Sequence, residues 1–175
     1  MGATEIRRGT AVAVLTPSTD EDFGYINSHL RDMDRFEQDH FVGVGGIDRR
    51  DSLDQMEASW TLHLHGEIVG YVALQVPPGR SPMANFRFMP MLSTVNVAHH
   101  PIDYARLSRP ILEYVAGRAP SWVEFFLSAP LSKYARSVKW HEKTMGWRRV
   151  AEYDAGGEMA TLFMITRKEL KNAIR

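Results

Sequence analysis

Residues 59–76 read SWTLHLHGEIVGYVALQV, and this stretch decides the fold. In its first half the apolar Trp60, Leu62 and Leu64 alternate with polar residues, which is the period-two pattern of a strand with one buried face. A His-Gly-Glu turn follows, and a second apolar run at 68–76 leads back. We therefore predict a β-hairpin at the centre of the chain.

Before this hairpin the pattern predicts one strand and two helices. The strand is the short apolar run at residues 11–15. Ser18 stands three residues before Glu21, which is the spacing of a capping box, so a helix should run from residue 19 to about residue 33. A second helical segment is expected at residues 34–41, where glycines follow.

After the hairpin, strands and helices alternate. In chain order we expect a loop at 77–82, a strand at 92–97, a helix from near 108 to 117, a strand at 122–127, a helix over 131–145, and a hairpin of 147–153 with 159–166. Pro110 favours the late start of the first of these helices, because proline fits a first turn and kinks an interior. The order β-α-α-β-β-β-α-β-α-β-β indicates an α/β fold, a mixed sheet with helices on both faces.

Composition excludes several classes of protein. A length of 175 residues fits one domain spanning residues 1–175. The 21 Lys and Arg balance the 21 Asp and Glu, which argues against nucleic acid as the main partner. The absence of cysteine excludes disulfides and thiolate metal sites. No apolar run approaches the roughly 20 residues of a membrane span, and residues 1–8 lack an apolar signal core. We expect a soluble protein made in a cytoplasm.

Three stretches resemble the GNAT superfamily of N-acetyltransferases. Residues 60–76 resemble its central hairpin, and residues 92–117 resemble the strand, phosphate loop and helix that hold acetyl-CoA. Residues 137–147 resemble its last helix, which often ends in a Tyr-x-x-x-Gly-aromatic pattern. This resemblance implies a mixed, mostly antiparallel sheet flanked by helices on both faces.

A finer resemblance is to the internal virion proteins of short-tailed phages, a branch with this fold. Residues 30–37, LRDMDRFE, are similar to a Leu-Arg-x-x-Asp-x-x-Glu pattern in their first helix, and residues 137–147, SVKWHEKTMGW, approximate a Ser-x-x-Trp-x-x-x-x-Gly pattern. The resemblance implies a bacteriophage structural protein that assists particle assembly or genome delivery, in the host cytoplasm and then in the virion. Its partners would be other virion or assembly proteins, or further copies of itself.

The segment that corresponds to the phosphate loop lacks the residues that bind pyrophosphate through the backbone. Such loops use glycines, which let N–H groups at a helix N-terminus approach the phosphates. Residues 99–108, HHPIDYARLS, contain no glycine, and Pro101 removes an N–H donor. The favoured interpretation is therefore a protein without a cofactor. Arg106, Arg109 and Ser108 keep an alternative open, an acetyl-CoA-dependent N-acetyltransferase whose side chains bind the phosphates.

The general acid for the departing thiolate is often a tyrosine four residues before the glycine of the last helix. Counting back from Gly146, that position is Glu142. A glutamate can serve as an acid only where burial favours its protonated form, so an ordinary surface role is favoured. Glu142 is the candidate catalytic residue only if the chain is an enzyme.

Two other groups of polar residues are set aside. Ser128 near His141 lacks the Gly-x-Ser-x-Gly elbow of a serine nucleophile, and we interpret Ser128 as a helix cap. His63, His65 and the pair at 99–100 match no zinc-binding spacing, so no metal site is predicted.

Overall fold

One eight-stranded sheet forms the centre of the computed structural model, which describes residues 2–29, 58–77, 79–90 and 101–172. Its strands are β1 (Thr4–Arg8), β2 (Ala11–Pro17), β3 (Ala58–Leu64), β4 (Glu67–Gln75), β5 (Met83–Pro90), β6 (Phe125–Ser128), β7 (Arg148–Asp154) and β8 (Met159–Thr166). They lie in the order β1-β2-β3-β4-β5-β6-β8-β7. Each neighbouring pair is antiparallel except β5 with β6, which is parallel.

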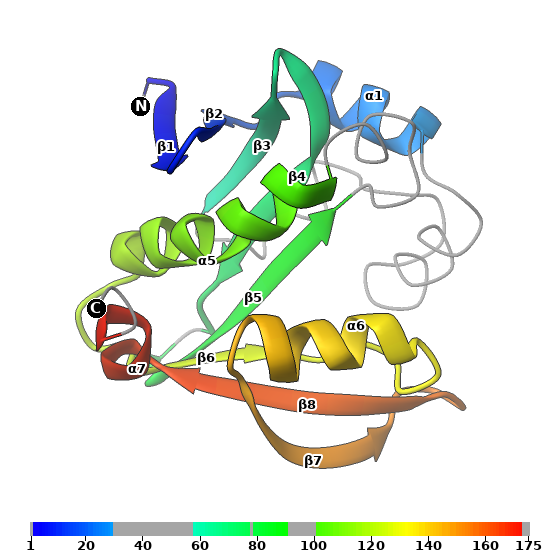
Figure 1. Ribbon diagram of the computed structural model, residues 1–175. Coiled ribbons are helices and arrows are strands. Elements are labelled where there is room, and N and C mark those ends of the chain that lie inside the picture. The colour runs from blue at the N-terminus through cyan, green and yellow to red at the C-terminus, as the bar shows by residue number, and fades with distance from the viewer. Residues whose placement is uncertain (1, 30–57, 78, 91–100, 173–175) are drawn as a thin grey trace.

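Helices lie against this sheet. They are α1 (Asp20–His29), α5 (Pro101–Arg118), α6 (Ala135–Lys139), which continues into a π turn at Trp140–Thr144, and α7 (Arg167–Asn172). Helix α5 contacts β1, β2 and β4, and α1 contacts β4. Figure 1 shows α5 crossing in front of the strands and α6 lying along β6 and β8.

The central strand β4 is buried on both faces. Every residue from Val69 to Leu74 is buried, and successive strand residues point to opposite faces. Both faces of the sheet are therefore covered, and the predicted mixed, mostly antiparallel sheet flanked by helices is confirmed. That residues 1–175 form a single domain stays a prediction.

The predicted central hairpin is confirmed as β3 and β4. His65 and Gly66 make its two-residue turn with φ angles of 51° and 84°, the left-handed region that Gly adopts without strain. Trp60, Leu62 and Leu64 are buried as their alternation predicts. Thr61 is buried too, because this part of the sheet is covered on the other side as well.

One predicted helix cap and one predicted helix start are wrong. Helix α1 is capped by Thr19 instead of Ser18: the Asp22 N–H donates to the Thr19 hydroxyl, and the Asp22 carboxylate accepts from the Thr19 N–H. Helix α5 begins at Pro101 and includes Pro110. Proline at the first helical position loses no intrahelical hydrogen bond, which is why the helix can begin there.

Strands were missed or misplaced in three regions. Residues 83–90, which lie between the loop predicted at 77–82 and the strand predicted at 92–97, form β5, and residues 4–8 form an unpredicted β1. Strand β6 begins at Phe125 instead of residue 122, because the Val123 N–H donates to the Pro120 carbonyl in a turn.

Several predictions lie outside the described residues. They are the helix at 34–41, the LRDMDRFE motif at 30–37, the strand at 92–97 and the histidine pair at 99–100.

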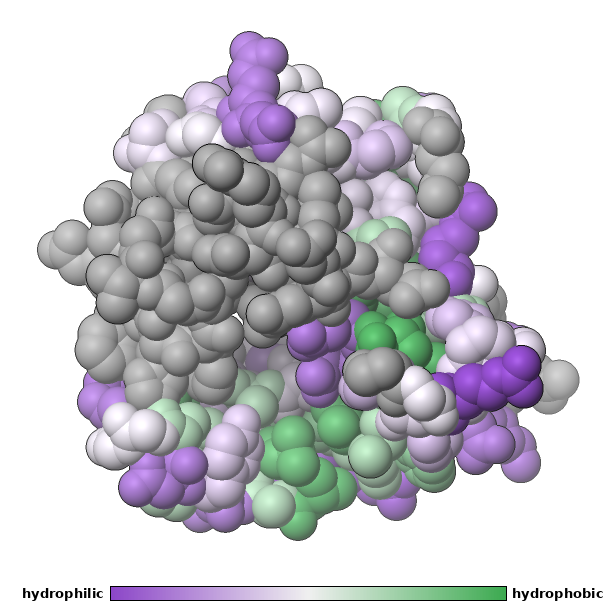
Figure 2. All heavy atoms as spheres, turned by 180° about the vertical axis from the view of Figure 1, so that it is seen from behind, coloured by the Kyte–Doolittle hydropathy of each residue, from purple (hydrophilic) through white to green (hydrophobic). Residues whose placement is uncertain are grey.

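The surface mixes apolar and polar residues. Figure 2, which views the molecule from behind, shows hydrophobic residues gathered near the lower edge, with hydrophilic residues beside them. The exposed large hydrophobic side chains of the described residues come from different elements: Met83, Ile102, Trp122, Val150, Tyr153 and Met159. None of the described helices combines the length and the apolar character needed to cross a membrane.

Candidate functional site

The parallel strands β5 and β6 form a fork. They pair over only three residues, from Met83 with Phe125 to Asn85 with Leu127. Beyond Asn85, β5 continues alongside β4 as far as Pro90, and Figure 1 shows it diverging from β6. Helix α5 lies between these strands in the chain. The carboxyl ends of parallel strands and the N-terminus of their connecting helix form a crevice that commonly binds ligands, so we place the candidate site here.

Ser128 and His141 form a hydrogen-bonded pair beside this fork. Ser128 is the last residue of β6 and the first beyond its final pair with β5. Its hydroxyl oxygen lies 2.9 Å from Nε2 of His141. On the other side of the ring, Nδ1 lies 2.8 Å from the carbonyl oxygen of Ser137. A carbonyl can only accept, so Nδ1 carries the proton and Nε2 accepts the hydrogen bond from the Ser128 hydroxyl.

Aromatic rings surround His141. Its ring stacks on Phe163 with 5.0 Å between centroids and meets Trp140 and Trp147 edge to face. Only 7% of His141 is exposed. Burial lowers the pKa of His141 from 6.5 to about 4, while the hydrogen bond to Ser137 opposes that shift. The imidazole is therefore neutral at pH 7, held in one tautomer.

The π turn that carries His141 interrupts the end of the last helix. The Met145 N–H donates to the Trp140 carbonyl five residues before it, at 3.0 Å. A π turn adds one residue to a helix and rotates the side chains before it relative to those after it, and such turns are frequent at functional sites. Counting back from Gly146 as in a regular α-helix therefore does not identify the side chain that faces the sheet.

The Ser128 prediction is wrong, and the pair with His141 that sequence reasoning set aside is present. Tyr134 is the N-cap of α6 and makes no side-chain cap bond, whereas Ser128 lies in β6. The two residues are 13 positions apart and match no nucleophile motif. The sequence indicated this contact only by placing Ser128 next to the end of a predicted strand and His141 on a predicted helix.

Glu142, the predicted acid, lies on the surface side of this turn. Its Oε1 accepts a hydrogen bond of 3.2 Å from Nε of Arg149. Arg149 also lies 3.6 Å from Glu152. Glu142 thus belongs to an ion-pair group on the half-exposed side of the helix, and its catalytic role stays a prediction.

The three predicted phosphate-binding residues lie on α5, past its first turn. Arg106 is exposed, and its carbonyl accepts a hydrogen bond from Arg8. Arg109 is half-buried, with Nε 3.5 Å from Glu113 in an ion pair. Ser108 is 1% exposed. The structure thus gathers two arginines on this helix, and their role in cofactor binding stays a prediction.

The N-terminal turn of α5 is held to the central hairpin. Nε2 of His65 lies 3.0 Å from the carboxylate of Asp103. Because His65 forms the tip of the turn between β3 and β4, this contact places the start of α5 against that hairpin.

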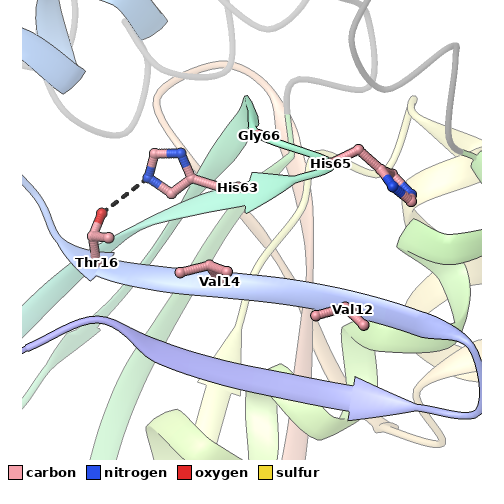
Figure 3. A pocket seen from close by; sticks show the side chains of 6 residues that line it. All are labelled: Val12, Val14, Thr16, His63, His65 and Gly66. Carbon is pink, nitrogen blue, oxygen red and sulfur yellow. Dashed lines mark hydrogen bonds between the residues drawn. The ribbon is translucent and has the colours of Figure 1, made fainter.

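A second hollow of about 390 Å³ lies on the outer part of the sheet. Figure 3 shows its lining, with His63 bonded to Thr16 at 3.0 Å and His65 turned toward α5. Burial lowers the pKa of His63, and the charge of Asp22 partly offsets this. The described residues include no group of three or more potential metal ligands. This hollow therefore brings together two valines, a glycine, the Thr16 hydroxyl and two histidines, one of which is paired with Asp103.

Sequence comparisons give no match: no protein-family model and no curated protein matches the chain. Solved structures do match it across most of its length. The GNAT domain of S. lividans PAT is 15% identical, with a TM-score of 0.65 over 94% of this chain and 96% of that chain. Spermidine N-acetyltransferase from Vibrio cholerae, in complex with CoA and spermine, is 13% identical, with a TM-score of 0.67 over 91% of this chain and 98% of that chain. An aminoglycoside acetyltransferase in complex with coenzyme A is 15% identical, with a TM-score of 0.65 over 93% of this chain and 99% of that chain.

These matches establish the fold and correct one expectation. The chain has the GNAT fold. The prediction of no cofactor is wrong by this comparison, because two of the three structures named above were solved with coenzyme A. The finer resemblance to phage virion proteins, with its structural role, partners and virion location, finds no support in these matches.

Proposed function

We propose that the protein is an N-acyltransferase that takes an acyl group from acyl-CoA and transfers it to a primary amine. The observation that carries this proposal is the fork between β5 and β6, which part after Asn85 and Leu127. Helix α5 follows β5 in the chain, and its first turn contacts the tip of the β3–β4 hairpin through Asp103 and His65. This arrangement suits a long, phosphate-bearing ligand, whose phosphates favour a helix N-terminus.

The acyl acceptor is proposed from the names of the structurally similar proteins. The two neighbours solved with coenzyme A are named for spermidine and for aminoglycosides, both of which carry amino groups. An amine acceptor also agrees with a neutral, buried histidine bonded to a hydroxyl at the fork, because amine acylation requires that a proton leave the nitrogen.

The positive charges of two arginines on α5 match the negative charges of the phosphates of such a ligand. Arg106 is exposed, and Arg109 is half-buried and forms an ion pair with Glu113 at 3.5 Å. Arginine binds phosphate through charge-assisted hydrogen bonds and can replace missing backbone donors. We therefore assign phosphate binding to Arg106 and Arg109, and we assign no phosphate contact to Ser108, because only 1% of it is exposed. Bound acyl-CoA would supply the activated thioester.

Calorimetric titration of the protein with acetyl-CoA and with CoA tests the proposal. We expect micromolar binding, weakened about tenfold by Arg106→Ala or Arg109→Ala, since a hydrogen bond to a charged group contributes roughly 1.5–3 kcal/mol. The matched control is Arg118→Ala at the other end of α5, where Arg118 stacks on Tyr114. Absence of binding at millimolar ligand would overturn the proposal.

A second assay separates an enzyme from a protein that only binds CoA. Release of free CoA thiol from acetyl-CoA is followed in the presence of spermine or an aminoglycoside. Release that depends on the amine supports the transferase. Micromolar binding without release from any primary amine would identify a sensor instead.

A further inference from the structure

We propose that Ser128 and His141 form a proton relay, in which Ser128 contacts the attacking amine and His141 acts through Ser128. This inference rests on the proposed function, because it assigns the proton transfers of that reaction. The resemblance to acetyltransferases implies an acid on the last helix, but it implies neither Ser128 nor the contact of Ser128 with His141. The geometry of four atoms carries it: Oγ of Ser128, Nε2 and Nδ1 of His141, and the carbonyl oxygen of Ser137.

The hydrogen bonds determine which way each proton points. The Ser137 carbonyl at 2.8 Å requires the proton on Nδ1 of His141. Nε2 then offers a lone pair, and the Ser128 hydroxyl, at 2.9 Å, donates its hydrogen to it. The remaining lone pairs of the Ser128 oxygen can accept only from a further donor. The pair thus presents an acceptor for an N–H group, as an amine substrate requires.

Ser128 and His141 differ in position and in exposure, and we assign them different roles on that basis. Ser128 is half-buried and stands where β6 leaves β5, at the vertex of the fork. His141 is 7% exposed, behind Ser128 and against Phe163. An amine in the fork could therefore touch the serine, whereas the histidine is shielded by its aromatic neighbours. Ser128 is accordingly a catalytic residue, and His141 is a positioning residue that also holds the proton.

The proton transfers balance over one turnover. The amine nitrogen forms a bond to the carbonyl carbon of the thioester, and its proton passes to the Ser128 oxygen while the serine proton passes to Nε2 of His141. The carbon–sulfur bond then breaks, and its electron pair leaves with the sulfur. The imidazolium returns its proton to Ser128, which protonates the thiolate. The amine proton ends on the thiol, and both side chains regain their starting states.

The environment of His141 suits an imidazole that carries the extra proton only briefly. Burial lowers the pKa of its imidazolium to about 4, far below the usual value of about 8.5 for a thiol. The imidazolium is therefore a strong enough acid to protonate the departing thiolate. The ring could not accumulate as a cation, which keeps it neutral for the next amine.

Three variants and one control test the relay. Ser128→Ala removes the hydroxyl, Ser128→Thr keeps one, and His141→Gln removes the ring. The control is Ser132→Ala, since Ser132 is also part-buried but bonds to the Thr161 hydroxyl at 2.7 Å. For each protein we measure acetyl-CoA affinity by calorimetry and amine-dependent thiol release with spermine and with an aminoglycoside.

We expect Ser128→Ala to bind acetyl-CoA within threefold of wild type and to release thiol at least about 100-fold more slowly, the usual contribution of general acid–base catalysis. Ser128→Thr should recover at least tenfold of that loss, and Ser132→Ala should stay within twofold of wild type. If Ser128→Ala binds acetyl-CoA and releases thiol at the wild-type rate, the relay is wrong while the transferase stands. If wild type binds no acetyl-CoA, the transferase itself is wrong and the relay falls with it.

Nitrogen NMR of His141 gives a readout that needs no turnover. In the free protein we expect a protonated Nδ1 and an unprotonated Nε2, with the Nε2 resonance shifted in Ser128→Ala. Adding CoA to wild type should move the same resonance, because the ligand enters beside Ser128. A proton found on Nε2 would overturn the relay, even in a protein that binds CoA, because Ser128 could then no longer donate to the ring.

Discussion

The Ser128 hydroxyl and the His141 ring are joined by a hydrogen bond of 2.9 Å, between the end of β6 and the π turn of the last helix. The second ring nitrogen is bonded to Ser137, so both polar ends of a buried side chain have partners. A buried polar group costs little when it is fully hydrogen-bonded and much more when a partner is lost or a charge is added. The same contact that suits proton transfer therefore makes this region sensitive to pH and to packing.

Stability should fall in mild acid because of His141. Its pKa is about 4 in the folded protein, against 6.5 for an unburied histidine. Between these values the unfolded chain binds the proton more readily, so the free energy of unfolding decreases as pH falls from 6.5 to about 4 and then levels off. A shift of this size corresponds to roughly 3 kcal/mol. Urea unfolding across that pH range measures it.

His141→Gln should flatten this pH dependence, because glutamine does not titrate. Burial also lowers the pKa of His63, so His63→Gln should remove a further part of the loss of stability in acid. An unchanged slope in His141→Gln would show that the buried imidazole does not control acid stability.

Packing under His141 should depend strongly on Phe163. Phe163 is fully buried and stacks on the imidazole at 5.0 Å. Phe163→Ala should lower the free energy of unfolding by about 3–5 kcal/mol, the usual cost of removing a buried phenyl ring. Met159→Ala, on the same strand but 49% exposed, should change it by less than about 0.5 kcal/mol. Similar losses in both variants, measured by urea unfolding, would contradict this packing.

The sequence predicts the central hairpin of the fold because the alternation from Trp60 to Leu64 and the glycine at the turn act locally. It does not predict β5 in the same way. Residues 83–90 begin in a loop-like context, and their strand form depends on pairing with β4 and, over three residues, with β6. Such pairing joins segments that are far apart in the chain, so it cannot be predicted from a local sequence pattern.

The candidate site was predictable only in part for a similar reason. Arg109 could be placed on the helix before the strand at 122–127 because strand and helix order are readable from periodicity, whereas Arg106 was expected to precede that helix, which in fact begins at Pro101. The contact between Ser128 and His141 was not predictable, because it depends on a π turn that adds a residue before Gly146. A count that assumes a regular helix selects Glu142 instead, whose carboxylate faces Arg149.

A side chain at position 146 should destabilise the fold, although there is room for one. Its φ angle is +70°, and no atom beyond its chain neighbours lies within 4 Å of the place that a Cβ would occupy. Gly146→Ala should therefore lower the free energy of unfolding by about 1–2 kcal/mol, the cost of a left-handed backbone for an L-residue. The matched control is Gly24→Ala in α1, where space is also open but the backbone is helical. That variant should gain about 0.5–1 kcal/mol. Thermal or urea unfolding that gives both variants the same sign would show that φ does not decide the effect.

Arg167 should contribute strongly to stability. It lies at the start of α7, and its guanidinium donates to four carbonyls at the end of α5 and in the loop beyond it: Ala116, Ala119, Pro120 and Val123. The shortest bonds, to Val123 and Pro120, are both 2.7 Å. A guanidinium can satisfy several acceptors in one plane, and its charge also favours the carbonyl end of a helix.

Arg167→Lys tests whether the planar fork matters beyond the charge. An ammonium group cannot reach all four carbonyls. Ala116 and Pro120 each also accept a backbone N–H, so the loss of stability comes mainly from the donors removed at Ala119 and Val123. We expect a loss of about 2–3 kcal/mol in urea unfolding for Arg167→Lys and a larger loss for Arg167→Ala, which also removes the cation 5.6 Å from the Phe126 ring. Lys168→Ala, at the exposed neighbouring position, should change stability by less than about 0.5 kcal/mol. If Arg167→Lys is as stable as wild type, charge alone accounts for the contact, and the end of α5 is held by other bonds.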